Sequence, residues 1–311
     1  KRNTHLALTY TINGAIRMNN TPDDKHPNHQ SDLPFQLSDD TVKNFADLVN
    51  ALAAHIGLDA EDTDDDPALR KPEHINTNDT FDYTFSDALT APACYWTNPD
   101  GSQGGIVAVA AHVHPMSAHI CPGAVIWPEA TIAGDTHIGK GTHIHPRAEI
   151  GFGAFIKYNC SIGAESRIGN YSSIGKQVHV GDNVRLGNAV RISRNSSVGN
   201  GTIIGDRALI RHVDIRKDVL IGDDVSIESS VLILDNAIVG HYVNIGKHAS
   251  IGEDVVICNY VAIHDRVSIK KSAYIGERIC LLKNATVDEE ASVTASTITP
   301  EIGFSTAREA A

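Results

Sequence analysis

The sequence is poor in aromatic residues and contains no long apolar run. Phe, Trp and Tyr make up 5% of its 311 residues, whereas Ile, Val and Gly are plentiful. This composition favours β structure over a helical bundle. No apolar run approaches the roughly 20 residues of a membrane-spanning helix, and no signal-peptide pattern opens the sequence. We therefore expect no membrane span and a cytoplasmic location.

The chain also lacks a basic surface. Its formal net charge is −12, and residues 1–112 carry 7 Lys and Arg against 17 Asp and Glu. Binding to nucleic acid depends on a basic patch that neutralises phosphates. The charge balance therefore argues against a nucleic-acid partner.

Cysteine is scarce and scattered. No CxxC motif and no Cys/His zinc spacing joins the five cysteines, so we expect reduced thiols in a reducing compartment and no metal. His143 and His145 flank Ile144 on one side of a strand and could share a metal ion. Two ligands without a third are weak evidence for such a site. The cysteines are Cys94, Cys121, Cys160, Cys258 and Cys280.

An aliphatic residue recurs every six positions through most of the chain. The series runs from Ile120 to Ile210, slips by one residue to Ile215, and continues to Val293. All 30 positions of the series are Ile, Leu or Val, and a small residue usually lies two positions before each. A period of six fits neither an amphipathic helix nor an ordinary strand meander.

The period of six predicts a short strand followed by a tight turn, with three such units completing one triangular coil. Aliphatic and small residues point inward, and the residues between them point outward. Gly or Asp after the aliphatic residue, and Asn or Asp near the corners, suit turns that need an unusual φ. Thirty units give about ten coils. The five-residue step from Ile210 to Ile215 predicts a local distortion at one corner.

This pattern is the hexapeptide repeat of parallel β-helices, and the chain resembles the hexapeptide-repeat acyltransferases. The resemblance implies a left-handed coil, homotrimers and sites between subunits. We therefore predict a mainly β fold, in which a left-handed parallel β-helix of about ten coils spans residues 117–298. A small acidic α/β domain over residues 1–116, which could bind the acceptor, precedes the β-helix, and a C-terminal tail over residues 299–311 follows it.

One histidine has a sequence context that matches the family. Residues 239–246 read V-G-H-Y-V-N-I-G, which is similar to the catalytic motif of UDP-3-O-acylglucosamine N-acyltransferases and sugar-nucleotide acetyltransferases. The resemblance implies that His241 is the general base, a role suited to imidazole because it titrates near pH 7. Stacking by one coil of 18 residues would place Asp223 below His241, where it could orient the ring. The same stacking places Asn259 above, where the family has its backbone oxyanion donor.

The donor in this family is an acyl thioester. Lys270, Lys271 and Arg278 lie in the most basic part of the repeat region, where they could hold anionic coenzyme A, as acyl-CoA or acetyl-CoA, or acyl carrier protein. The implied reaction is transfer of an acyl group to a sugar nucleotide or a similar small amine or alcohol, without a permanently bound cofactor.

The N-terminal region is harder to interpret. Ser38 can cap an amphipathic helix that reaches Ile56, and an acidic loop is expected over residues 59–82. Strands are expected over residues 5–10 and 105–110. The stretch at 114–120, H-P-M-S-A-H-I, is similar to the entry into the prism of several sugar acyltransferases.

Two other functions stay open on the sequence alone. A trimeric, non-enzymatic β-helix scaffold would account for the regular repeat without long loops. A γ-class carbonic anhydrase uses the same prism, but its pair of zinc-binding histidines five residues apart has no counterpart in residues 117–293.

Overall fold

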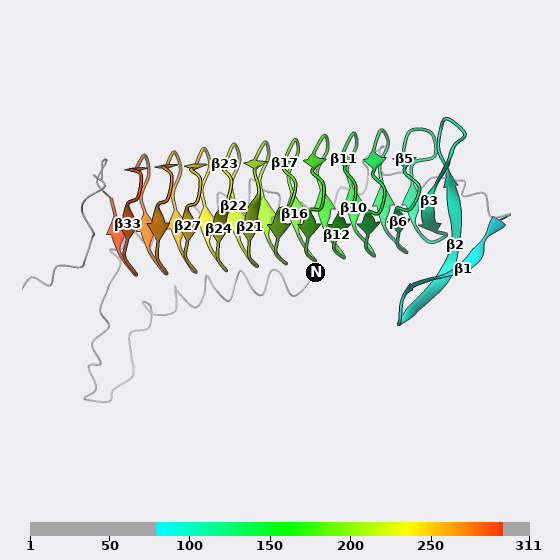
Figure 1. Ribbon diagram of the computed structural model, residues 1–311, viewed down its shortest axis with the longest axis horizontal. Helices are drawn as coiled ribbons and strands as arrows, with labels where there is room; N and C mark the ends of the chain where they lie inside the picture. The colour runs from blue at the N-terminus through cyan, green and yellow to red at the C-terminus, as the bar shows by residue number, and fades with distance from the viewer. Residues whose placement is uncertain (1–78, 295–311) are drawn as a thin grey trace, which may run out of the picture. The chain divides into compact units, whose positions relative to one another are not determined.

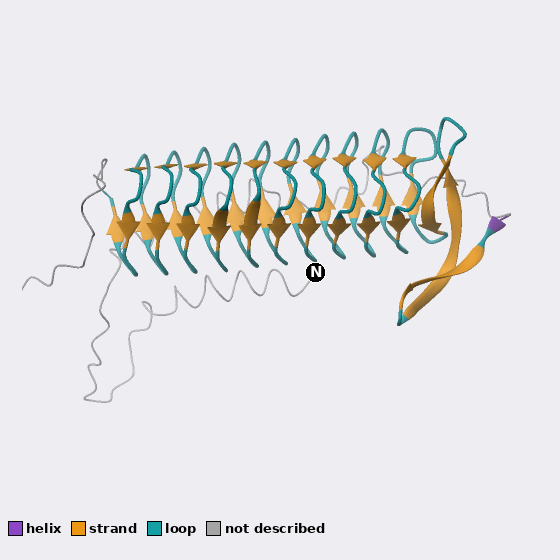
Figure 2. Ribbon diagram, in the orientation of Figure 1, coloured by secondary structure: helices purple, strands orange, loops and turns teal. Residues whose placement is uncertain are grey.

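The computed structural model describes residues 79–294. Within this range the protein consists of β-strands joined by tight turns, and its strands wind into a parallel β-helix (Figures 1 and 2). The expected helix ending at Ile56, the expected strand over residues 5–10 and the expected tail all lie outside the described residues.

Three parallel sheets form the three faces of the β-helix, and we name them A, B and C. Sheet C has 10 strands, so the prediction of about ten coils is confirmed. In sheet C these are β5 (His119–Ile120), β8 (His137–Ile138), β11 (Phe155–Ile156), β14 (Ser173–Ile174), β17 (Arg191–Ile192), β20 (Leu209–Ile210), β23 (Ser226–Ile227), β26 (Asn244–Ile245), β29 (Ala262–Ile263) and β32 (Cys280–Leu281).

Sheet B has 11 strands and sheet A has 13. In sheet B these are β4 (His112–Val113), β7 (Thr131–Ile132), β10 (Glu149–Ile150), β13 (Arg167–Ile168), β16 (Arg185–Leu186), β19 (Ile203–Ile204), β22 (Leu220–Ile221), β25 (Ile238–Val239), β28 (Val256–Ile257), β31 (Tyr274–Ile275) and β34 (Ser292–Val293). In sheet A these are β1 (Phe81–Ser86), β2 (Leu89–Thr97), β3 (Gln103–Ala108), β6 (Val125–Ile126), β9 (His143–Ile144), β12 (Ser161–Ile162), β15 (His179–Val180), β18 (Ser197–Val198), β21 (Val213–Ile215), β24 (Val231–Ile233), β27 (Ser250–Ile251), β30 (Ser268–Ile269) and β33 (Thr286–Val287).

The sheets of the β-helix begin before residue 117, where the sequence pattern placed its start. β3 pairs in parallel with β6, and β4 pairs in parallel with β7, so both belong to the first coil. β1 and β2 extend sheet A as an antiparallel hairpin. Residues 81–113 are therefore β structure joined to the prism, and the expected strand over residues 105–110 corresponds to β3. The pattern gave a later start because the six-residue period holds only from Ile120 onward.

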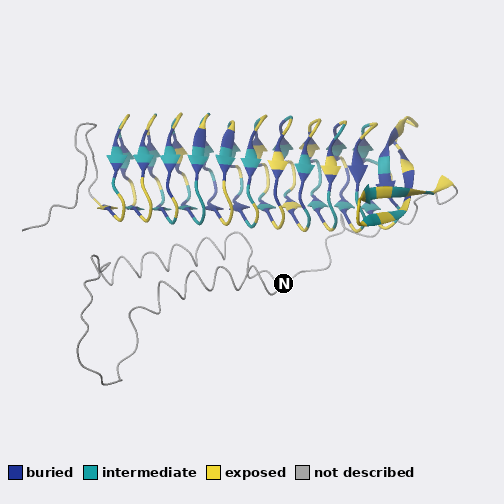
Figure 3. Ribbon diagram, turned by 60° about the horizontal axis from the view of Figure 1, so that its bottom comes forward, coloured by how far each residue is buried: buried dark blue, intermediate teal, exposed yellow. Residues whose placement is uncertain are grey.

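The core is a column of aliphatic side chains inside the prism. Buried residues occur in every coil (Figure 3). Successive coils pair in register, so that Ile156 lies against Ile138 and Ile174. Small buried hydroxyls between the strands bond to the backbone of the next coil. Thr142 Oγ1, for example, donates to the carbonyl of Lys157 at 2.8 Å. These hydrogen bonds give the buried hydroxyl groups a partner where no water can reach them, which avoids the free-energy cost of burying a polar group unpaired.

The backbone at the corners gives reasons for the turn residues that differ from those expected from the sequence. The positive φ falls three positions after the inward aliphatic residue, as at Asn159 (57°) and Ala189 (55°). The glycine directly after the aliphatic residue has another reason. A Cβ on Gly163 would lie 2.4 Å from the carbonyl carbon of Gly181 in the next coil. Attributing these glycines to an unusual φ was wrong, because close approach between coils excludes a side chain there.

The expected distortion at the five-residue step is confirmed. The turn between β20 and β21 has its positive φ at His212 (51°), only two positions after Ile210. β21 is also longer than most strands of the prism, since it starts at Val213. The missing residue is therefore absorbed at the corner between sheets C and A.

Candidate functional site

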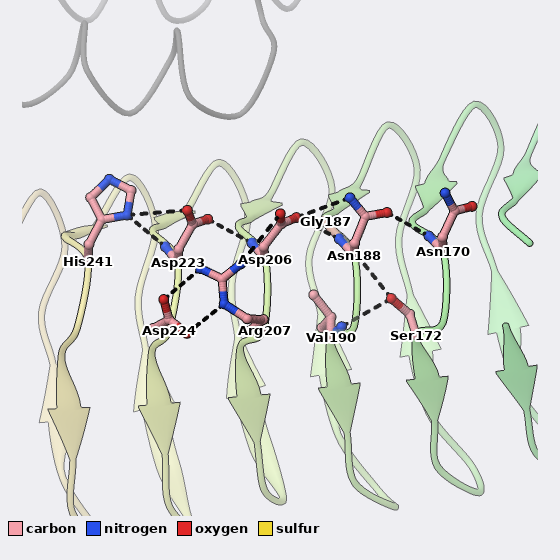
Figure 4. A network of polar contacts seen from close by, with 10 residues as sticks. All are labelled: Asn170, Ser172, Gly187, Asn188, Val190, Asp206, Arg207, Asp223, Asp224 and His241. Atoms are coloured by element: carbon pink, nitrogen blue, oxygen red, sulfur yellow. Dashed lines mark hydrogen bonds and ion pairs between the residues drawn. The ribbon is translucent and has the colours of Figure 1, made fainter. Parts of the chain in front are cut away.

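His241 lies in the turn between β25 and β26, at the corner between sheets B and C. A ladder of side chains runs along this corner, one rung per coil (Figure 4). At each rung a side-chain acceptor takes a hydrogen bond from the backbone N–H of the equivalent residue one coil earlier. The acceptor residues, with donor–acceptor distances from 2.7 to 2.9 Å, are Asn170, Asn188, Asp206, Asp223, His241 and Asn259.

His241 replaces an Asn or Asp in this ladder. Its Nδ1 accepts from the backbone N–H of Asp223 at 2.9 Å, and the Oδ1 of Asn259 accepts from the N–H of His241 at 2.7 Å. A backbone N–H can only donate, so Nδ1 carries the lone pair in this geometry. The neutral ring then holds its proton on Nε2.

Asp223 and Asn259 are the one-coil neighbours of His241, as the 18-residue spacing predicts. The contacting atoms differ from the prediction. The carboxylate Oδ2 of Asp223 lies 3.8 Å from Nδ1, beyond hydrogen-bonding distance, while its backbone N–H makes the bond. The side chains of His241 and Asp223 are 17% and 7% exposed, so both are largely shielded from water.

The ladder ends at Asn259. The next residue in the column is Glu277, and no hydrogen bond from the backbone N–H of Asn259 is formed within residues 79–294. Asn259 is half-buried. The corner therefore has, one coil above the imidazole, a backbone N–H without an acceptor among the described residues.

An ion pair lies beside the part of the ladder that precedes His241. Arg207 forms a two-point ion pair with Asp224, with Nε–Oδ1 and Nη2–Oδ2 distances of 2.8 and 2.7 Å. The hydrogen bond from Arg207 holds the pKa of the Asp224 carboxyl below its usual value. This pair sits beside Asp223 on the outer side of the same corner (Figure 4).

Exposed aromatic residues continue the outer side of the corner above His241. The rings of Tyr242 and Tyr260 are stacked with centroids 5.0 Å apart, and the guanidinium of Arg278 lies 5.9 Å from the centroid of the Tyr260 ring. Both tyrosines are about half exposed. Tyr242, Tyr260 and Arg278 lie in one column because they are 18 residues apart, which is one turn of the three-sided coil.

The predicted donor-binding residues are not brought together. Arg278 shares the corner of His241, but Lys270 and Lys271 follow β30 at the corner between sheets A and B. Lys270 contacts Asp288 at 2.7 Å, and Lys271 contacts Glu253 at 3.0 Å. Lys271 is thus paired with a carboxylate, which also holds its pKa above the usual value.

A second group of chemically reactive side chains lies on the outer face of sheet C. The ligand atoms of His119, Cys121 and His137 are all within 4.8 Å of one another. The sequence search for metal sites missed this group because it looked for CxxC motifs and Cys/His zinc spacings along the chain and did not compare positions one coil apart. The signal was a His-x-Cys unit followed, one coil later, by another histidine. His143 and His145 do not belong to this cluster.

The comparisons with known proteins agree with the repeat. The family model described as bacterial transferase hexapeptide (six repeats) matches residues 117–152 and 159–194. These residues form consecutive coils of the prism. The chain therefore contains hexapeptide repeats.

Among solved structures, this hexapeptide-repeat protein is similar to a mutant GDP-perosamine N-acetyl transferase from Caulobacter crescentus in complex with CoA and GDP-perosamine. The identity is 26% over 36% of this chain and 53% of that chain, with a TM-score of 0.35. It is also similar to LpxA from Acinetobacter baumannii, at 18% identity over 60% of this chain and 71% of that one, with a TM-score of 0.35. The matched part thus spans about half the length of the perosamine enzyme.

A third similar structure is the UDP-N-acetylglucosamine acyltransferase from Campylobacter jejuni, at 19% identity over 60% of this chain and 68% of that one, with a TM-score of 0.26. At these TM-scores the likeness says nothing about the activity of the hexapeptide-repeat protein. No curated protein sequence matches the chain. Within the described residues, no helix is long and apolar enough to cross a membrane.

Proposed function

We propose that this hexapeptide-repeat protein is an acyltransferase and that His241 is its general base. The acyl group would pass from coenzyme A or acyl carrier protein to a sugar nucleotide or a similar small amine or alcohol. The observation that carries the proposal is the end of the corner ladder, where an imidazole occupies an Asn/Asp position directly below an N–H that the described residues leave without an acceptor. The match to the transferase repeat supports the same reaction class.

The chemistry assigns one task to each group. The amine or hydroxyl of the acceptor attacks the thioester carbonyl. His241 takes the proton of the attacking group at Nε2, for which the neutral ring must first carry its own hydrogen on Nδ1. The oxyanion that forms accepts a hydrogen bond from the backbone N–H of Asn259. The C–S bond then breaks, and the proton passes from His241 to the leaving thiolate.

Asp223 gives His241 the means to accept that proton. In the neutral form with a hydrogen on Nδ1, and in the imidazolium, Nδ1 can no longer accept from the backbone N–H of Asp223. The Oδ2 of Asp223, 3.8 Å away, is the acceptor within reach of a small ring rotation. The carboxylate also stabilises the imidazolium by its opposite charge. Asp223 is thus a positioning residue for the base.

Of the three basic residues predicted to bind the donor, Arg278 is the one we propose for this site, because it shares the corner of His241. We further propose a homotrimer, in which the exposed faces of the prism pair with copies of the chain. Sedimentation equilibrium of the full chain measures this directly.

The ladder also favours a second function, that of a non-enzymatic scaffold. Nδ1 of His241 performs the same backbone contact as the Asn and Asp side chains below it. A structural role alone would therefore be met by any side chain with an acceptor at this position.

His241→Asn separates the two functions, because Asn retains the acceptor and removes the imidazole. The assay is thiol release from acetyl-CoA, longer acyl-CoAs and acyl carrier protein thioesters, with sugar nucleotides and amino sugars as acceptors. We expect transfer by the wild type and its loss in His241→Asn at unchanged melting temperature. Equal activity of the two proteins would remove His241 from the mechanism. If isothermal calorimetry detects no binding of any of these donors, the scaffold is the better description.

A further inference from the structure

We propose that His119, Cys121 and His137 form a binding site for a transition-metal ion of the zinc class. The site lies on the outer face of sheet C, at the end of the prism where the first two coils meet. It is separate from the corner of His241, which precedes β26. In sheet C, β26 lies six strands beyond β8, or about 29 Å away at about 4.8 Å per coil. The proposal therefore does not depend on the acyltransferase function.

The backbone brings the three side chains to one face. His119 and Cys121 flank the buried Ile120, so both point away from the core. His137 is the register partner of His119 in the next strand of the sheet. One coil later, the position equivalent to Cys121 is Gly139, so no side chain stands there.

The distances suit a metal with nitrogen and sulfur ligands. Cys121 Sγ lies 3.6 Å from His137 Nε2. Zn–S and Zn–N bonds of about 2.3 and 2.0 Å at a tetrahedral angle place the two ligand atoms about 3.5 Å apart. The third ligand atom, on His119, is within 4.8 Å of both. A rotation of the His119 ring, which is stacked on His137 with centroids 5.1 Å apart, completes the set.

The ligand chemistry also suits a metal. A neutral imidazole has the lone pair that a metal needs. A thiol loses its proton when it binds a metal, so binding would release a proton from Cys121.

The position in the fold gives the ion a structural task. β5 is the edge strand of sheet C and has a strand neighbour on one side only. On its other side it is covered by Asn98, whose Oδ1 accepts from Ile120 N–H at 2.8 Å, and by Trp96, whose Nε1 donates to the Ala118 carbonyl at 3.2 Å. An ion held by His119, Cys121 and His137 would fasten the edge strand to β8. Three protein ligands leave a fourth position for water.

Cobalt(II) is the probe, because a cobalt–thiolate bond produces a charge-transfer band in the near ultraviolet. The full chain, without a histidine tag and after dialysis against a chelator, is titrated with Co²⁺ and then with Zn²⁺. We expect one Co²⁺ per chain with the thiolate band, and loss of the band as Zn²⁺ displaces cobalt. Absence of the band in the wild type would overturn the proposal.

Variants locate the site on the chain. Cys121→Ser should abolish the band, and His119→Gln should weaken binding while leaving the buried core untouched. Two matched controls should keep the band: Cys280→Ser, which removes another half-buried cysteine from the outer face of sheet C, and His143→Asn, which removes an exposed histidine from sheet A. A band that survives Cys121→Ser, or that disappears equally in Cys280→Ser, would contradict the assignment.

Thermal unfolding gives an independent readout. Zn²⁺ should raise the melting temperature of the wild type and of Cys280→Ser, because an ion that binds only the folded coil stabilises it. The same addition should leave Cys121→Ser unchanged. An equal rise in all three proteins would show binding elsewhere and would overturn the proposal.

Discussion

The backbone N–H of Asp223 donates to Nδ1 of His241 at 2.9 Å, across one coil of the β-helix. The bond makes the imidazole a structural part of the corner as well as a candidate base. The same pair offers a second contact, between Nδ1 and the Asp223 carboxylate, that only a ring with a hydrogen on Nδ1 can use.

The structural part of this contact predicts different stabilities for two replacements of His241. His241→Ala leaves the N–H of Asp223 without its acceptor, which should lower the free energy of unfolding by about 1–3 kcal/mol. His241→Asn restores the acceptor and should stay within about 0.5 kcal/mol of the wild type. Urea denaturation of the three proteins measures the difference. Equal losses in both variants would mean that the ladder bond contributes nothing.

Removing the charge of the Asp223 carboxylate should lower activity without affecting folding. Asp223→Asn keeps the Oδ1 that accepts from Asp206 N–H at 2.7 Å, so the ladder remains. The amide removes the negative charge and cannot stabilise the imidazolium. We expect acyl transfer to fall by at least about 100-fold, by analogy with the loss of the carboxylate behind a catalytic histidine. The pH profile checks the mechanism, since a merely structural effect would lower the rate without altering its pH dependence.

Corner residues with a positive φ predict a stabilising substitution. Ala189 is exposed and has a φ of 55°, a conformation that costs a residue with a Cβ about 1–2 kcal/mol. Ala189→Gly removes that cost. Part of the gain is lost, because glycine gives the unfolded chain more conformational entropy. A net gain of about 0.5–1 kcal/mol is expected from chemical denaturation.

Ala164 is the matched control for this substitution, because it is a corner alanine outside the positive-φ residues. Ala164→Gly should lower stability, since only the unfolded chain gains freedom there. If both glycine variants lose stability equally, backbone strain at Ala189 is not the cause.

Close packing between coils predicts different effects on stability when two glycines are replaced by alanine. A Cβ at Gly163 would lie 2.4 Å from the backbone of Gly181, so Gly163→Ala should cost about 1–3 kcal/mol. At Gly276 the nearest atom would be the carbonyl oxygen of Val293 at 3.2 Å. Gly276→Ala should therefore change stability by less than about 1 kcal/mol in either direction. Melting curves of the two variants decide between spacing and φ as the reason for glycine after the aliphatic residue.

The sequence was sufficient to predict the coil, because one aliphatic residue in six is a direct readout of which side chains point inward. Ile156, for example, lies between Ile138 and Ile174 as the 18-residue spacing requires. The first coil was harder to detect. Val107 and Val113 are buried like their successors, but the step from Val113 to Ile120 is seven residues, which breaks the period.

Spacing also placed Asp223 and Asn259 next to His241, but it could not specify which atoms meet. A period gives neighbouring positions, whereas side-chain torsions decide whether a carboxylate or a backbone N–H faces the ring. Closeness in sequence was also a poor guide to closeness in space. A three-sided coil places neighbouring residues at different corners, as it does for Lys270, Lys271 and Arg278. His119, Cys121 and His137 met across a coil for the same geometric reason.

The shortened turn after Ile210 shows that the three corners keep independent registers. One residue is lost between β20 and β21, yet the corner ladder crosses the same coil without a break, because Asp206 and Asp223 bond at a spacing of 17 residues. A chain of this kind can lengthen or shorten one edge while the other two stay aligned. Variation in length at the edge of Arg211 and His212 would therefore leave His241 and its neighbours in place, so that new loops can arise on one side of the molecule without disturbing chemistry on another.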